Sequence, residues 1–233
     1  MKKRLFLLML AGLMAFSLCA CKKEGPKGIN SNFGSNEKDL VVFNDLSVQD
    51  VMTADFDTKK DDKDEYVSYL QEELDAYNAG ASFVPQTAAE GEEDNFTPHF
   101  TVPVSVASCT VDKNVINQQL LYATASDYVA YNQEIIESRG GNTLQAGKLT
   151  SADASVTGAS LIDPDDKNGG FVDIQEILTG KNADNYCYVI CNFEAAIYLE
   201  GEVAGFTSTG VYDSTKDCVT VPAGKTVVIL FKK

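Results

Sequence analysis

The sequence has no tryptophan and a single histidine, His99, among its 233 residues. A metal site built from several histidines is therefore excluded, and any histidine-based catalytic triad would have to use His99. No GxSxG elbow accompanies His99 and no cysteine flanks it, so we interpret it as a loop residue. The lack of tryptophan also disfavours a carbohydrate-binding face, although ten tyrosines keep that class open.

Basic residues are also scarce. The chain has 19 lysines and arginines against 34 aspartates and glutamates, which gives a formal net charge of −15 at pH 7. Such a surface repels phosphates and anionic lipid head groups, so we expect no nucleic-acid partner. The sequence lacks a Walker loop, a GxGxxG motif and an HExxH motif. It therefore gives no indication of a cofactor and argues against common nucleotide-binding and zinc-protease functions.

One long apolar run stands at the start of the chain. Three basic residues at positions 2–4 precede residues 5–18, which are apolar apart from Gly12 and Ser17. The run is shorter than the roughly 20 residues that span a bilayer. Its length and basic start are typical of a secretory signal. We therefore predict a signal peptide over residues 1–20.

The residues after this run predict a lipid anchor. An ordinary signal peptidase requires small residues one and three places before the cut, and Leu18 is too bulky for a cut before either nearby cysteine. The stretch Leu-Cys-Ala-Cys at 18–21 instead resembles the lipobox of bacterial lipoproteins. The resemblance implies that Leu18, Cys19 and Ala20 form the recognition sequence, although alanine or serine is more usual than Cys19 at its place. It also implies cleavage before Cys21 and a lipid on Cys21, often with a further acyl group such as palmitate.

Because two acyl chains anchor a protein stably, the predicted location is the cell membrane, facing outward. Residues 21–38 are polar and rich in glycine, serine and asparagine, which is typical of a flexible tether with a reach of roughly 20–25 Å. We predict a single extracytoplasmic domain over residues 39–233. Its length suffices for one sizeable core or two small ones.

The clearest helix signal lies in the acidic stretch after residue 60. Apolar side chains recur there at spacings of three and four, which predicts an amphipathic helix. The predicted apolar stripe consists of Tyr66, Tyr69, Leu70, Leu74 and Tyr77. Asp62 is the predicted N-cap, with Glu65 completing a capping box, and Asn78 and Gly80 are predicted to end the helix.

Further elements predict the fold class. A second helix is predicted over 127–138 with Ser126 as its N-cap, and a short third helix over 174–179 between Asp173 and Gly180. Residues 142–170 show little periodicity. Strands are predicted over 39–43, 51–57, 100–111, 114–124, 186–199, 202–212, 218–221 and 226–232. Helices mixed with antiparallel strands indicate α+β, with two to three amphipathic helices on antiparallel sheets and mostly strands in the C-terminal third.

Four cysteines follow the predicted anchor: Cys109, Cys187, Cys191 and Cys218. They allow three disulfide connectivities. Cys187 and Cys191 lie on one predicted strand, where their Cα atoms would be roughly 13 Å apart. That separation exceeds the reach of a disulfide. We expect buried free thiols, and the alternative is one cross-strand disulfide to Cys218 or Cys109.

Two acidic stretches invite comparison with cation sites. Residues 165–176 place a glycine, an apolar residue and Glu176 where an EF-hand loop requires them. Lys167 and a glycine occupy two of the ligand places, so the favoured interpretation is an ordinary turn before a capped helix. No metal is predicted, and Asp165 and Glu176 are left as the calcium candidates. The acids of residues 55–62 are explained by the start of a helix.

The order of the elements resembles a family. The acidic helix, the strand pair, the segment SDYVAYN at 126–132 and the closing VPAGKTVVILFK at 221–232 resemble small uncharacterised bacterial lipoproteins of the anaerobic Gram-positive type. The resemblance covers most of residues 39–233. It implies anchoring to the cytoplasmic membrane, facing outward, and no catalytic residues.

We therefore expect a non-enzymatic interaction or envelope-associated module with an unidentified protein or envelope partner. The alternative is a carboxylate-based hydrolase acting on envelope or host polymers. Two convergent acids, one with a raised pKa, would favour the hydrolase. An exposed apolar or aromatic patch without such a pair would favour the module.

Overall fold

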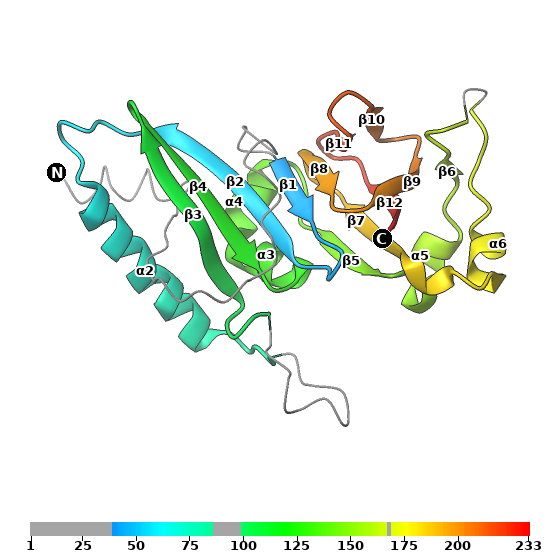
Figure 1. Cartoon of the computed structure of the whole chain (residues 1–233), viewed down its shortest axis with the longest axis horizontal. Coiled ribbons are helices and arrows are strands. Elements are labelled where there is room, and N and C mark those ends of the chain that lie inside the picture. Colours follow the sequence, from blue (N-terminus) through cyan, green and yellow to red (C-terminus); the bar gives the residue numbers. More distant parts are fainter. Residues whose placement is uncertain (1–38, 86–98, 167–168) are drawn as a thin grey trace. The chain divides into compact units, whose positions relative to one another are not determined.

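The structure is a computed structural model, and it describes residues 39–85, 99–166 and 169–233 (Figure 1). The predicted signal peptide and tether, with Leu18, Cys19, Ala20 and Cys21, lie outside these residues. Helices and mainly antiparallel strands are mixed, and strands dominate the C-terminal part, so the predicted α+β class is confirmed. No helix in the described ranges has the length and apolar character to cross a membrane.

The described chain divides into two compact units. Unit 1 contains the described residues of Gln49–Ala123, and unit 2 contains those of Thr124–Lys233 together with the segment that ends at Val48. The prediction of a single domain over residues 39–233 stays a prediction.

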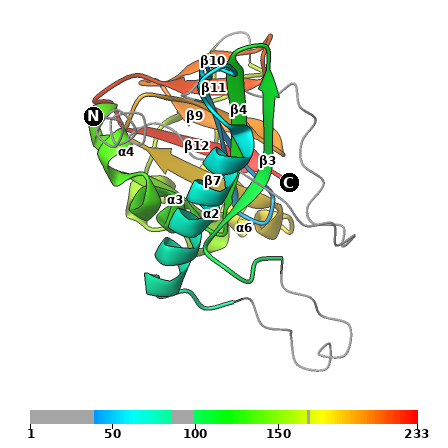
Figure 2. The ribbon, with the colours of Figure 1, turned by 90° about the vertical axis from the view of Figure 1, so that its left-hand side faces the viewer.

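In its described residues, unit 1 has three strands and an α-helix. The strands lie in the order β2-β4-β3, and the antiparallel pair β3–β4 has a bulge between Val106 and Ser108. Figures 1 and 2 show the helix α2 running along one face of β3 and β4. The elements are β2 (Val48–Asp55), α2 (Lys63–Gly80), β3 (Val104–Asp112) and β4 (Val115–Tyr122).

Helix α2 begins at the predicted N-cap. Asp62 Oδ1 accepts hydrogen bonds from the backbone N–H groups of Asp64 at 2.8 Å and Glu65 at 3.2 Å. Leu70 and Leu74 are buried, but the predicted stripe is wrong at Tyr69, which is 38% exposed. Tyr69 lies about 100° around the helix from Leu70, and Glu73 lies closer to the buried face, half-buried.

The C-terminal end of α2 is hydrogen-bonded to β3. Asn78, predicted as a stop, lies inside the helix, which ends at Gly80 as predicted. Its side-chain Nδ2 donates to the Val104 carbonyl at 2.9 Å, and its Oδ1 accepts from the Val104 N–H at 3.2 Å. The amide therefore pairs with the β3 backbone as a neighbouring strand would.

Unit 2 contains two groups of strands. One has the order β10-β11-β8-β1 and the other β5-β7-β12-β9-β6. All pairs are antiparallel except β1–β8, which is parallel. The strands are β1 (Asp39–Val42), β5 (Leu144–Lys148), β6 (Leu161–Ile162), β7 (Tyr186–Cys191), β8 (Ala195–Leu199), β9 (Glu202–Thr207), β10 (Val211–Asp213), β11 (Cys218–Val221) and β12 (Val227–Lys232).

The two sheets of unit 2 face each other. A Cβ added to Gly210 would lie 2.9 Å from Cγ1 of Val227 in β12 and 3.2 Å from Cγ1 of Val219 in β11. Gly210 therefore lies where both sheets meet, and a larger side chain would need its neighbours to move. The strands predicted over 186–199 and 202–212 are wrong as single elements, because the chain breaks at 192–194 and 208–210 to pass between the sheets.

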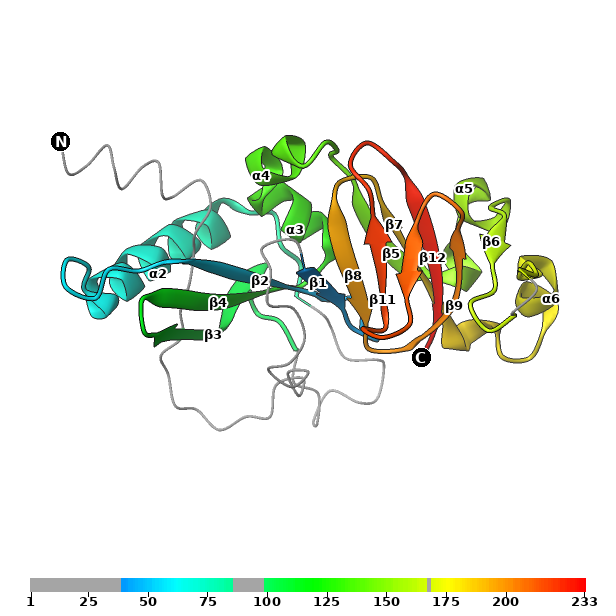
Figure 3. The same cartoon turned by 90° about the horizontal axis from the view of Figure 1, so that it is seen from above.

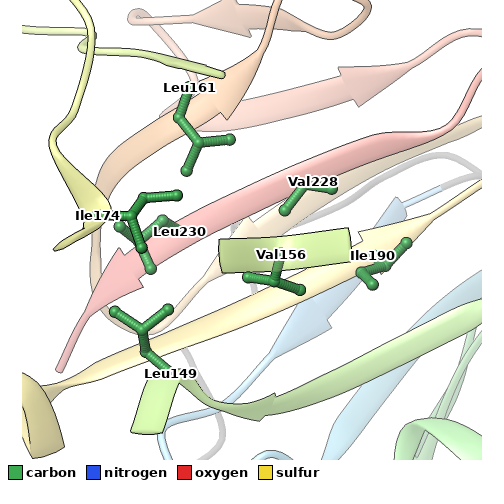
Figure 4. Packing of buried hydrophobic residues seen from close by; sticks show 7 residues of the cluster. All are labelled: Leu149, Val156, Leu161, Ile174, Ile190, Val228 and Leu230. Carbon is green, nitrogen blue, oxygen red and sulfur yellow. The ribbon is translucent and has the colours of Figure 1, made fainter. Parts of the chain in front are cut away.

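The five-stranded sheet also buries its other face. Short helices cover it, namely α5 (Ala154–Thr157), α6 (Ile174–Thr179) and the 3₁₀ segment Leu149–Ser151. Figures 1 and 3 show α5, β6 and α6 gathered at one end of the unit. The residues that form this cluster (Figure 4) are Leu149, Val156, Leu161, Ile174, Ile190, Val228 and Leu230. Residues 142–170 thus hold β5, α5 and β6, which the sequence did not predict.

Two of the predicted helices can be compared residue by residue. Helix α6 has Asp173 as N-cap and ends at Gly180, as predicted. The helix predicted over 127–138 is divided at the buried Asn132 into α3 (Ala125–Tyr131) and α4 (Gln133–Ser138). Its N-cap is Thr124, whose Oγ1 accepts from the Asp127 N–H at 3.1 Å, because Ser126 already lies in the first turn. Asn132 Nδ2 donates to the Tyr128 carbonyl at 3.1 Å, in addition to the helical hydrogen bond that the Asn132 N–H makes to the same carbonyl at 3.0 Å.

Candidate interaction surface

One apolar row crosses the five-stranded sheet from its core to solvent. Aligned residues on paired strands point to the same face. The registers align Val189, Ile229, Phe206, Ile162 and Phe171 across β7, β12, β9 and β6 and the residue bridged to β6. Val189 and Ile229 have no exposed surface, Phe206 is 8% exposed and Phe171 is 68% exposed. The row therefore leaves the core at the β6 side of the sheet.

The facing sheet ends before this row does. Its inward row joins Leu40, Ile197, Val219 and Tyr212, and Tyr212 belongs to the last strand, β10. The Tyr212 ring lies against Phe206, with ring centroids 6.0 Å apart. In the described part of unit 2, no strand of this sheet follows β10 to cover Phe171. We call Ile162, Phe171, Phe206 and Tyr212 the apolar edge.

Aspartates border the apolar edge. The Tyr212 hydroxyl donates to Asp217 Oδ1 at 2.8 Å, and the charge of Asp165 also acts on it. Burial, followed by these carboxylates, raises the pKa of Tyr212 to about 12. Residues 161–173 and 211–218 together contain six aspartates and two lysines. The exposed apolar side chains therefore lie in a negative field.

Of the two calcium candidates, Asp165 lies near this edge, and the two do not belong to a metal-binding cluster among the described residues. Asp165 is exposed, and its backbone N–H donates to Asp163 Oδ1 at 2.8 Å. Glu176 is exposed in the first turn of α6, where its N–H donates to Asp173 Oδ1 at 3.0 Å. In residues 39–85, 99–166 and 169–233 no three His, Cys, Asp or Glu side chains are placed to hold a metal ion. Asp165 and Glu176 remain calcium candidates from the sequence alone, and an ordinary turn before a capped helix stays the favoured interpretation.

Unit 1 has a polar interior beneath α2. Gln118 has no exposed surface, accepts a hydrogen bond from the Tyr66 hydroxyl at 3.2 Å, and places Nε2 3.8 Å from Met52 Sδ. Its cross-strand neighbour is Cys109. Burial raises the pKa of Tyr66 and raises the pKa of the Cys109 thiol to about 12. Both groups stay protonated at neutral pH, so neither is a ready nucleophile.

Glu73 is an acid in unit 1 with the raised pKa that one acid of a hydrolase pair would require. Burial raises the pKa of its carboxyl, and Oε2 is enclosed without a hydrogen-bond partner among the described residues. A second carboxylate nearby would add charge repulsion to this shift, but burial is its only cause. The raised pKa of Glu73 therefore does not mark a pair of convergent acids.

The expected burial is confirmed for three of the four cysteines, whereas Cys109 is only half-buried. The four cysteines of the described chain are free thiols, and Cys187, Cys191 and Cys218 are buried while Cys109 is half-buried. Cys187 and Cys191 share one face of β7, aligned with Phe231 and Val227 of β12. His99 is exposed and lies outside the helices and strands.

Comparison of the chain with protein-family models, with curated proteins and with solved structures gave no match. The resemblance to small bacterial lipoproteins stays a prediction. Sequence reasoning also missed Phe171. Strand β6 has only two residues, Leu161 and Ile162, so the alternation that reveals longer strands is absent. The aspartates around it drew attention to the region only as calcium candidates, where the favoured interpretation was an ordinary turn before a capped helix.

Proposed function

We propose that this protein is a lipid-anchored extracytoplasmic interaction module that contacts its partner through the apolar edge. The observation that carries the interaction role is the 68% exposure of Phe171 at the end of a row that is otherwise core. Covering exposed apolar surface is favourable by about 25 cal/mol per Å². Exposed apolar patches of soluble domains are accordingly common contact sites.

The anchor rests on the lipobox at residues 18–21. Cys21→Ser should abolish incorporation of an alkyne-labelled palmitate and leave the precursor unprocessed, because serine offers no thiol for the thioether. Cys19→Ser is the matched control, since this position would be removed with the signal peptide, and it should keep the label. Lipid label on the Cys21→Ser protein would refute the anchor.

The hydrolase alternative finds less support. Its best acid is Glu73, and the raised pKa there has burial as its cause and gives no sign of a second acid. The apolar edge, in contrast, ends in the exposed aromatic side chain of Phe171, as expected of a contact surface.

The interaction role can be tested in cells. A photo-crosslinking amino acid at position 171 of the anchored full chain should give a discrete protein adduct. Val84 is the control position, because it is also apolar and is 84% exposed, but belongs to unit 1. The same adducts at both positions, or adducts with lipid alone, would overturn the proposal.

A further inference from the structure

We infer that the apolar edge binds an extended peptide with alternating apolar and basic side chains, which pairs with β10 as an additional strand. This inference rests on the proposed function, because it names the partner class of the same surface. It follows from the arrangement of the strands, from the aspartates and from the sequence of β10.

The strand arrangement fixes where the peptide would lie. Within unit 2 the sheet that ends in β10 has four strands and the facing sheet has five, and in the described chain β10 pairs with β11 alone. Neighbouring strands are about 4.8 Å apart in both sheets. Because Tyr212 of β10 contacts Phe206 of β9, a strand added beside β10 would face the next members of the row, Ile162 and Phe171.

The side chains of the peptide follow from the two faces of β10. Tyr212 points inward, so peptide residues on its face would contact Ile162 and Phe171 and should be apolar. Val211 and Asp213 lie on the outer face, aligned with Thr220 and Cys218. A basic peptide residue opposite Asp213 would form a favourable cross-strand pair. Successive strand residues alternate between faces, so the matching sequence alternates apolar and basic residues.

The charge at this edge selects against other occupants. Asp165 and Asp217 lie close to Tyr212. A second copy of the chain paired through β10 would bring these carboxylates together with their counterparts, and anionic lipid would be repelled for the same reason. A cationic strand instead gains from the field, and its binding should weaken with added salt.

The edge strands of the molecule also differ in protection. Lysines, prolines, bulges and short length are the usual devices that prevent an edge strand from pairing. Strand β3 has a bulge and β5 ends with Lys148. Strand β10, with the sequence Val-Tyr-Asp, has its short length and one charged residue, Asp213, but no lysine, proline or bulge. A peptide can therefore pair with β10, but only over a few residues. The expected affinity is modest, and most of it should come from contact with Phe171.

The test uses the full chain purified in detergent and fluorescent octapeptides of alternating valine and lysine. These peptides should raise the fluorescence anisotropy on binding, at least about tenfold more tightly than the same peptide with glutamate in place of lysine. Methylation of alternate backbone nitrogens should abolish binding, because a strand pair needs its N–H groups. The amides of β10 should exchange more slowly with solvent when the peptide is bound.

Two variants locate the binding site. Phe171→Ser should weaken binding of the valine–lysine peptide about tenfold or more, whereas Val84→Ser should leave it unchanged. Equal binding of the glutamate peptide, indifference to N-methylation, or an unchanged affinity of Phe171→Ser would each overturn the inference. If position 171 gives a protein adduct in cells but the purified chain does not bind the peptide, the proposed interaction module stands and the inferred strand partner is refuted. Absence of both would refute the two proposals together.

Discussion

The space between the two sheets of unit 2 differs in polarity from the interior of unit 1. Between the sheets of unit 2, Val189, Ile229 and Phe231 have no exposed surface and are surrounded by apolar side chains. Unit 1 buries Gln118 and Asp50, and Asp50 accepts hydrogen bonds from the Tyr122 hydroxyl at 3.0 Å and the Leu120 N–H at 3.3 Å. Apolar contacts tolerate small shifts, but buried polar groups are costly whenever a partner is lost. Stability should therefore depend on apolar contact in the sheet layers of unit 2 and on the hydrogen bonds of Gln118 and Asp50 in unit 1.

The largest expected effect is a cavity in unit 2. Leu230→Ala removes a side chain with no exposed surface from the layer between the five-stranded sheet and its short helices. Such truncations cost about 2–5 kcal/mol of the free energy of unfolding. Urea unfolding with hydrogen exchange of unit 2 amides measures the loss, and Gln175→Ala, exposed on α6, is the control. A loss below about 1 kcal/mol would show that this layer contributes little.

The next effect concerns hydrogen bonding in unit 1. Gln118→Met keeps most of the volume but leaves the Tyr66 hydroxyl without the acceptor it has at 3.2 Å. The expected cost is about 1–3 kcal/mol. Adding Tyr66→Phe removes the hydroxyl that has lost this acceptor and should recover part of the lost free energy of unfolding. The double variant should therefore be more stable than the sum of the two single losses predicts. Strict additivity in this cycle would contradict a role for the hydrogen bond.

Local signals in the sequence were sufficient for several elements. The cap at Asp62, the helix between Asp173 and Gly180 and the strand Cys218–Val221 were all predicted, because a capping side chain, a glycine and an alternating run each act within a few residues. The breaks between strands at 192–194 and 208–210 were not predicted. They arise where one apolar run supplies strands to two different sheets, which is a property of the tertiary structure.

The candidate surface was predicted least well, for a related reason. Nothing near Phe171 in the sequence marks it as a surface residue of interest. Its role follows from its alignment with apolar residues that lie far apart in the chain. Asn132 shows the same limit, because the apolar spacing around it predicted one helix, whereas the structure has α3 and α4 with the buried Asn132 between them.

A smaller effect concerns how the stability of unit 1 depends on pH. Burial raises the pKa of Glu73 in the folded state. The unfolded chain therefore releases this proton first, and the contribution of Glu73 to stability falls as the pH rises from its unfolded pKa, about 4.3, through the higher folded value. Glu73→Gln should remove this decline and be slightly more stable than the parent at pH 7 but equal at about pH 3. Urea titrations at both values measure it, and Glu72→Gln, exposed on the same helix, should change neither.

The smallest expected effect is on Phe171, and it distinguishes a binding surface from a core. Phe206 and Phe171 belong to one row, but they are 8% and 68% exposed. Phe206→Ser should cost several kcal/mol by analogy with other buried aromatic truncations, whereas Phe171→Ser should change the free energy of unfolding by no more than about 0.5 kcal/mol. Calorimetric unfolding of both variants compares them directly. A large loss for Phe171→Ser would make it a structural residue, whereas unchanged stability together with a lost crosslink or lost peptide binding would mean that its apolar surface serves contact with a partner.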